Sequence, residues 1–108
     1  MLVMVAGPYS APTEAARAEN LAAMNRAAAL VLARGHVPVI GVNAALPVLE
    51  AAGLPYSDAA MTAISLALAE RCDAVLHIGR SPGAEREVEV VRAKGGAVFT
   101  SIADLPSA

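Results

Sequence analysis

Ser81 and the residues that follow it form the segment of the sequence that is best suited to bind a ligand or to take part in a reaction. Ser81, Pro82 and Gly83 come in the order that is typical of a helix N-cap followed by proline at the first helical position. A helix that begins here would offer free N–H groups, its dipole and the Ser81 hydroxyl to a phosphate or a carboxylate. The same residues are also compatible with an ordinary N-cap that binds no ligand.

Glu87 lies farther along the same predicted helix. Helical periodicity points Ala84, Val88 and Val91 toward the interior, and it points Glu85 toward water. Glu87 is one residue step from Val88, about 100° around the helix, so its carboxylate falls at the border of the apolar face. We expect a partly buried carboxylate there. A solvated glutamate that interacts with the helix dipole is the alternative, and periodicity alone leaves both open.

Tyr9, Asn43 and His77 are the other side chains that suit a site. Tyr9 lies in the segment Gly7–Ser10, directly after the first apolar run. Its hydroxyl could enter a pocket, or the ring could pack against the protein with the hydroxyl in water. Gly7, Ser10 and Asn43 are candidate substrate contacts beside it. His77 lies within an apolar run, where a core histidine is commoner than an acid. We expect no metal and no cofactor, because no metal-ligand spacing, phosphate-binding glycine loop or dinucleotide motif is present.

A parallel α/β scaffold is predicted by the apolar runs that surround these residues. The run Asn43–Ser57 is interpreted as a loop with at most one helical turn, because Pro47, Gly53 and Pro55 interrupt it. Ser57 or Asp58 can cap the next helix, with Met61, Ile64 and Leu68 facing inward. Helices are expected over 13–34, after the cap at Ser57 or Asp58, and over 82–94. Strands are expected over Leu2–Ala6, Val37–Val42, Asp73–Ile78 and Ala97–Ser101.

Alternating strands and helices of this kind predict a single Rossmann-like domain over residues 1–108. The expected sheet is parallel, with strand order 2-1-3-4 and helices on both faces. A functional crevice is then expected at the carboxyl ends of the strands. The loops at that edge are Gly7–Ser10, Gly41–Asn43 and Gly79–Gly83, whereas Asp73 and His36 lie at the opposite edge and are expected to be structural.

Composition restricts the classes of partner. The 108 residues include 26 alanines, and 56% of the chain is hydrophobic. A small Ala- and Val-rich core buries little area per residue, which favours a homo-oligomer. The net charge of −2 and scattered arginines argue against binding a nucleic acid polymer. The longest uncharged run, Gly35–Leu49, contains two prolines and is too short to cross a membrane. A single cysteine, Cys72, is typical of a reduced, cytoplasmic protein.

Four motifs carry a resemblance to a known group of enzymes. Ala6–Ser10, Arg34–Pro38, Cys72–Leu76 and Ser81–Glu87 come in this order. Together they resemble the nucleoside 2-deoxyribosyltransferase-like superfamily, in particular a group of short bacterial and phage proteins of largely unassigned function. The resemblance covers most of the chain, and its first and last motifs are the most specific.

The resemblance implies a flavodoxin-like sheet, an oligomer, and chemistry at the N-glycosidic bond of a nucleoside or nucleotide. Glu87 matches the nucleophile that attacks the anomeric carbon, and a carboxylate suits this task because it can form a glycosyl ester. Tyr9 matches the tyrosine that holds the nucleophile by a hydrogen bond. Ser81 and the N–H groups near Gly83 match the site for the 5′ end or 5′-phosphate of the sugar.

Ser65 departs from the superfamily pattern. Members that cleave nucleosides usually carry an aspartate at this position, eight residues before Asp73. Two hypotheses therefore remain open: an N-glycosidase or deoxyribosyltransferase that uses Glu87, and a non-catalytic protein that binds a nucleotide or a related phosphorylated ligand. A phosphoribohydrolase of the cytokinin-activating kind ranks last, because its turn carries more glycines and a longer spacing to the glutamate.

Overall fold

The sheet has four parallel strands in the order β2-β1-β3-β4. A computed structural model describes all residues, 1–108. The strands are β1 (Leu2–Ala6), β2 (Val37–Val39), β3 (Ala74–His77) and β4 (Ala97–Phe99). β1 pairs with β2 and β3, and β3 pairs with β4. The predicted parallel sheet of order 2-1-3-4 is confirmed, and the arrangement is flavodoxin-like.

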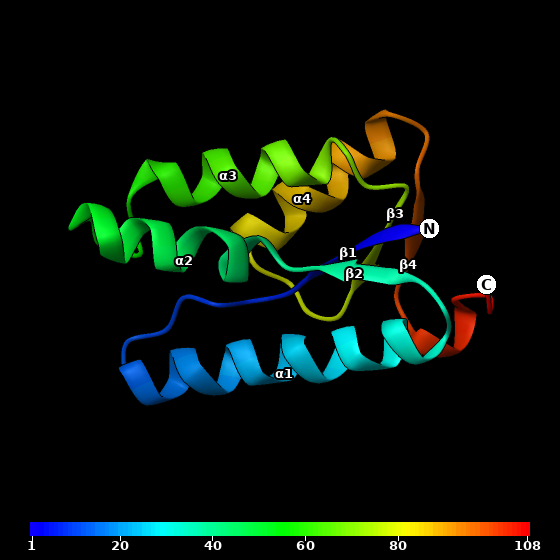
Figure 1. The fold of residues 1–108 in the computed structure, drawn as a ribbon, viewed down its shortest axis with the longest axis horizontal. Helices are drawn as coiled ribbons and strands as arrows, with labels where there is room; N and C mark the ends of the chain where they lie inside the picture. The colour runs from blue at the N-terminus through cyan, green and yellow to red at the C-terminus, as the bar shows by residue number, and fades with distance from the viewer.

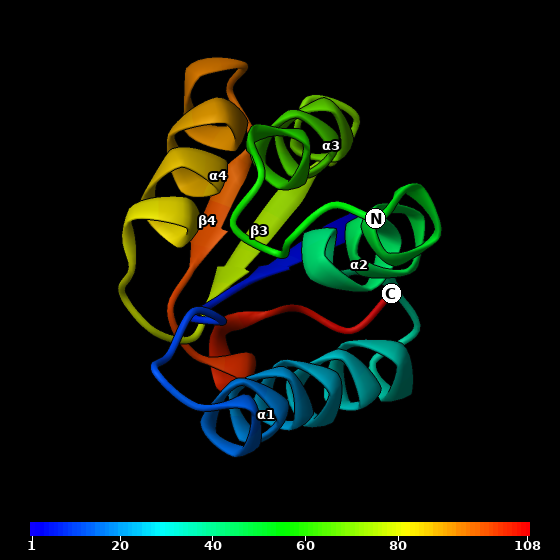
Figure 2. The same cartoon turned by 90° about the vertical axis from the view of Figure 1, so that its left-hand side faces the viewer.

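Helices cover both faces of the sheet (Figures 1 and 2). The helix α1 (Glu14–Ala33) lies on one face with the short 3-10 helix η1 (Ile102–Asp104) beside it. The other face carries α2 (Gly41–Ala52), α3 (Ala59–Ala69) and α4 (Pro82–Ala93). This distribution follows from right-handed crossovers that run in one direction from β1 to β2 and in the other from β2 to β3 and β4. None of the helices combines the length and apolar character needed to cross a bilayer.

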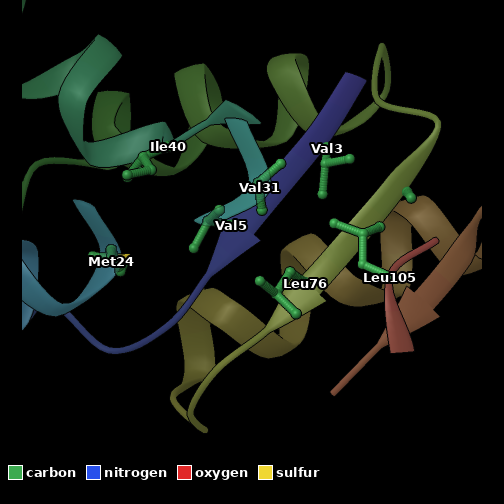
Figure 3. Close-up of a cluster of buried hydrophobic side chains, with 8 residues drawn as sticks. Val3, Val5, Met24, Val31, Ile40, Leu76 and Leu105 are labelled. Carbon is green, nitrogen blue, oxygen red and sulfur yellow. The ribbon is translucent and has the colours of Figure 1, made fainter. Parts of the chain in front are cut away.

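The strands are buried on both faces and so divide the interior into two clusters. On the α1 side, Val3 and Val5 of β1 pack with Leu76, Met24 and Leu105 (Figure 3). On the other side, the alternate strand residues Met4, Ala6 and Val75 pack against Ala69 of α3 and against the inner face of α4, which consists of Ala84, Val88 and Val91. This two-sided burial explains why each strand is a continuous apolar run in the sequence.

α2 is the main departure from the sequence prediction. It is a regular helix of 12 residues where a loop with at most one turn was expected, and Pro47 lies in its middle. Pro47 is exposed, so its ring and the missing N–H disturb only the solvent side. Ala45 and Leu49 are fully buried, and this burial offsets the cost of the proline. The helix ends at Gly53, whose φ of 73° is left-handed.

The early start of α2 also shortens β2. The strand ends at Val39 instead of Val42, because Ile40 is already the N-cap of α2. In α3, the most buried residues are Ser65 and Ala69. The stripe expected from Met61, Ile64 and Leu68 is only half-buried.

Asp73 and His36 form hydrogen bonds at the edge of the sheet where the strands begin, opposite to the carboxyl ends of the strands. The Asp73 carboxylate accepts a hydrogen bond from the N–H of Leu2 at 2.8 Å. His36 is buried, with Nδ1 2.9 Å from the amino group of Met1 and Nε2 against the carbonyl oxygen of Pro106. Both residues therefore have the structural roles that were expected of them.

Candidate functional site

A pocket of about 400 Å³ opens at the carboxyl ends of β1 and β3. Its walls come from the β1–α1 loop, the first turns of α2 and α4, and the inner side of α3. The structure brings six of the sequence-predicted site residues together here: Gly7, Tyr9, Ser10, Ser81, Gly83 and Glu87. They come from segments far apart in the sequence, which meet because parallel strands end at one edge of the sheet.

Asn43 is the predicted contact that the structure does not bring to the pocket. It is exposed in the first turn of α2, and its Nδ2 donates to Asn25 Oδ1 of α1 at 2.7 Å. Its neighbours Gly41 and Val42 do line the pocket. The difference arises because the expected loop is a helix, and helical geometry turns the Asn43 side chain away from the backbone that faces the pocket.

Glu87 is the most deeply buried carboxylate in the protein. Its relative exposure is only 8%, and its carboxylate has no hydrogen-bond partner. Burial raises the pKa of Glu87 from 4.5 to about 7, because the ionised form loses hydration. The carboxyl group is therefore poised between its neutral and ionised forms near neutral pH, the range in which a nucleophile or an acid–base group is useful.

Ser65 and Gly41 lie directly against this carboxylate. A Cβ placed on Gly41 would be 2.2 Å from Ser65 Oγ and 2.8 Å from Glu87 Oε2. Real Cβ atoms do not approach so closely, so only glycine allows α2, α3 and α4 to meet at this point. Ser65 is buried, with 9% exposure. The structure thus places two residues directly beside Glu87: Gly41, which was expected in a loop at this crevice, and Ser65, which was recognised only as a departure from the superfamily aspartate.

Ser81 caps α4, as its position predicts. Its hydroxyl accepts a hydrogen bond from the N–H of Ala84 at 3.1 Å, and its carbonyl oxygen accepts from the N–H of Glu85 at 2.9 Å. Pro82 has no N–H, so Gly83 supplies the remaining first-turn donor. Gly83 is exposed, and a Cβ placed there would meet nothing within 4 Å. An anionic group can therefore approach this turn closely.

Tyr9 and Tyr56 form the aromatic part of the pocket. Their ring centroids are 5.7 Å apart, with the planes at 81°, an edge-to-face arrangement that aromatic pairs favour. The Arg17 guanidinium lies 4.5 Å from the centroid of Tyr56 and fixes that ring from the α1 side. The Tyr9 carbonyl accepts from Asn20 at 3.0 Å, whereas its hydroxyl makes no hydrogen bond to Glu87.

His77 lies outside this pocket. It lines a shallower depression on the other side of the β3–α4 connection, with Glu85 and Arg80. Its Nε2 is buried without a hydrogen bond, 3.6 Å from Glu85 Oε1. The chain contains no group of three or more His, Cys, Asp or Glu side chains that could hold a metal ion.

Several other residues of the pocket had no fixed place from the sequence. Tyr56 and Asp58 could cover the site, but nothing placed them there, and Asp58 was also a possible helix cap. Both line the pocket, as do Thr62 and Arg86, and Asp58 caps α3. Their positions depend on how α2 and α3 pack together, and no local pattern in the sequence reports this. Comparisons with protein-family models, with curated proteins and with solved structures found no match to the chain. The function must therefore be argued from the site itself.

Proposed function

We propose that this protein cleaves the N-glycosidic bond of a nucleoside or a nucleotide, by hydrolysis or by transfer, with Glu87 as the nucleophile. The observation that carries the proposal is an unpaired, buried carboxylate in a pocket of about 400 Å³. A structural glutamate at such a position is normally paired, because burying an unpaired charge is costly. The pocket matches the volume that small-molecule sites commonly have.

The proposed reaction proceeds in two displacements. A carboxylate oxygen of ionised Glu87 attacks the anomeric carbon, the glycosidic C–N bond breaks, and the base leaves with the bonding electron pair and takes up a proton. Water then attacks the glycosyl ester in hydrolysis, or a second base attacks it in transfer, and Glu87 is regenerated. Both routes share the first displacement, so Glu87 is required in each.

The remaining residues would hold the two ends of the substrate. The Ser81–Gly83 turn suits the 5′-oxygen or 5′-phosphate of the sugar, because Gly83 exposes an N–H at the positive end of α4. Tyr9 and Tyr56 present aromatic surface to a base, and the Tyr9 hydroxyl is free to contact the substrate or Glu87. Gly7 and Ser10 complete the wall beside Tyr9.

Base release is the decisive assay. The purified protein is incubated with ribo- and deoxyribonucleosides and their 5′-monophosphates, and free base is measured by chromatography with and without a second base as acceptor. Glu87→Ala is expected to abolish release, whereas Glu85→Ala should retain it. Glu85 is a matched control: it lies on the same helix, pairs with Arg80 at 3.1 Å, and lies outside the pocket. Equal activity of the two variants would contradict the assignment of the nucleophile.

A non-catalytic binding protein is the second candidate. Two observations favour it: Ser65 supplies no acidic proton to a departing base, and the Tyr9 hydroxyl is not bonded to Glu87. If the wild type releases no base from any of these substrates, and a nucleotide or another phosphorylated ligand still raises its melting temperature, the binding function is correct.

The proposal includes a cytoplasmic homo-oligomer. Several large apolar side chains remain exposed on the monomer, including Leu30, Leu32, Val37 and Val48. Apolar surface of this kind on a small domain is typical of subunit contacts. The buried, free thiol of Cys72 fits a reducing compartment.

A further inference from the structure

Several polar groups that lack side-chain hydrogen-bond partners lie close together at the first turn of α2. The α2 N-cap, Ile40, makes no side-chain hydrogen bond, so the N–H groups of this turn have no side-chain acceptor. The Glu87 carboxylate lies against Gly41 in the same turn, and the Ser65 hydroxyl reaches the same point from α3. Both residues are at least nine-tenths buried, and neither side chain is hydrogen-bonded to another group of the protein.

The separation of the two side chains follows from their distances to Gly41. Ser65 Oγ and Glu87 Oε2 lie 2.2 and 2.8 Å from one common point, the position of a Cβ on Gly41, so they are at most about 5 Å apart. They are not hydrogen-bonded in the structure. Rotation about χ1 moves the Ser65 oxygen, and the Glu87 side chain has three rotatable bonds, so the two groups can reach hydrogen-bonding distance without a change in the backbone.

We propose that Ser65 is the positioning residue of Glu87: its hydroxyl donates a hydrogen bond to Oε2 of the ionised carboxylate, at the positive end of α2. A hydrogen bond to a charged acceptor in a buried site is strong, and it is directional. It leaves Oε1 free to face the pocket. The catalytic consequence rests on the proposed function, whereas the contact between Ser65 and Glu87 does not.

The other titratable groups around Glu87 do not replace this donor. Tyr9, Tyr56, Asp58 and Arg86 also line the pocket, and Arg86 is exposed on α4. Cys72 is buried, and burial raises the pKa of its thiol to about 11, so it is neutral near pH 7. The Ser65 hydroxyl is the side-chain donor that shares with the Glu87 carboxylate the space next to Gly41.

A titration of Glu87 tests the proposal without requiring activity. The chain is labelled with ¹³C at the glutamate carboxyl groups, the Glu87 resonance is identified by its loss in Glu87→Gln, and its pKa is followed by NMR. Ser65→Ala is expected to raise the pKa of Glu87 by roughly one to two units, since the ionised form loses its donor. Ser65→Thr, which keeps a hydroxyl, is expected to restore most of the shift.

Thr62→Ala is the matched control. Thr62 lies one turn before Ser65 on α3 and also lines the pocket, but it is not among the nearest neighbours of Gly41. Its removal is expected to leave the pKa of Glu87 unchanged. An unchanged pKa in Ser65→Ala would overturn the proposal, as would a rise in Tyr9→Phe with none in Ser65→Ala, because the latter result assigns the contact to Tyr9.

The outcome separates this proposal from the proposed function. If the wild type releases no base and the pKa still responds to Ser65→Ala, the contact is correct and the enzymatic function is wrong. If base is released and the pKa does not respond, the enzymatic function stands and the role of Ser65 is wrong. In an active protein, Ser65→Ala should lower kcat at least tenfold with little change in KM, and its pH–rate profile should shift to higher pH.

Discussion

Replacing Glu87 with glutamine should stabilise the protein at neutral pH. The pKa of Glu87 rises from 4.5 to about 7 on folding, and one unit corresponds to about 1.4 kcal/mol, so keeping this carboxylate ionised in the folded state costs about 3 kcal/mol. Glutamine has nearly the same shape and no charge to desolvate. Glu87→Gln should therefore gain up to about 3 kcal/mol relative to the wild type, and lose base release at the same time.

The pH dependence of this gain identifies its cause. Below about pH 4.5, Glu87 is protonated in both the folded and the unfolded state, so it does not affect stability. Between about pH 4.5 and 7 the unfolded state releases the proton and the folded state retains it, and the stability of the wild type falls as the pH rises. Above about pH 7 both states are ionised and the penalty is constant. The advantage of Glu87→Gln should grow across this window and then level off.

Urea denaturation followed by circular dichroism measures the effect, at several values from about pH 4 to pH 8. Glu85→Gln is the control: its carboxylate is half-exposed and pairs with the exposed Arg80, so its free energy of unfolding should change by less than about 1 kcal/mol. A difference between Glu87→Gln and the wild type that is the same at every pH would refute the reasoning, as would a variant that is less stable at neutral pH.

Four further results are expected. Base release should rise with pH up to about pH 7 and then level off, because only ionised Glu87 is a nucleophile; a flat profile contradicts this role. Gly41→Ala should cost about 1–3 kcal/mol in urea denaturation despite the helix preference of alanine, because its Cβ would overlap Ser65, whereas Gly83→Ala, which meets open space, should be close to neutral. Cys72 is fully buried and its pKa is raised to about 11 by that burial, so the folded protein should not react with a thiol reagent that labels the urea-unfolded chain. Light scattering at micromolar concentration should give the mass of a dimer or a larger oligomer, and a stable monomer would contradict the proposed homo-oligomer.

The sheet could be predicted because its sequence signals are local. Each strand is a short apolar run with a glycine within two residues of one end, and the amphipathic pattern of α4 turns Val88 and Val91 inward. The same periodicity placed Glu87 at the edge of the apolar face, and this position becomes a buried carboxylate once α2 and α3 cover it. Prediction succeeded where one helix or one strand determines the environment.

α2 could not be predicted for the opposite reason. Local sequence preferences disfavour a helix here because Pro47 would lie in its interior. The burial of Ala45 and Leu49 offsets the free-energy cost of this proline. Missing this helix placed Asn43 in the pocket. Gly41 was expected at the crevice, but its close approach to atoms of α3 and α4 was not foreseen. Ser65 was recognised only as a departure from the superfamily aspartate, since a serine in an Ala-rich helix gives no local signal of what it faces.

The two tyrosines have a practical consequence. The chain contains no tryptophan, and its only tyrosines are Tyr9 and Tyr56, which pack edge to face in the wall of the pocket. All tyrosine emission of the protein therefore originates at the candidate site, without the tryptophan background that masks it in most proteins. A molecule that enters the pocket, or that displaces Arg17 from Tyr56, changes the surroundings of every fluorophore in the chain. The tyrosine fluorescence of the unlabelled wild-type protein therefore reports whether the pocket is occupied.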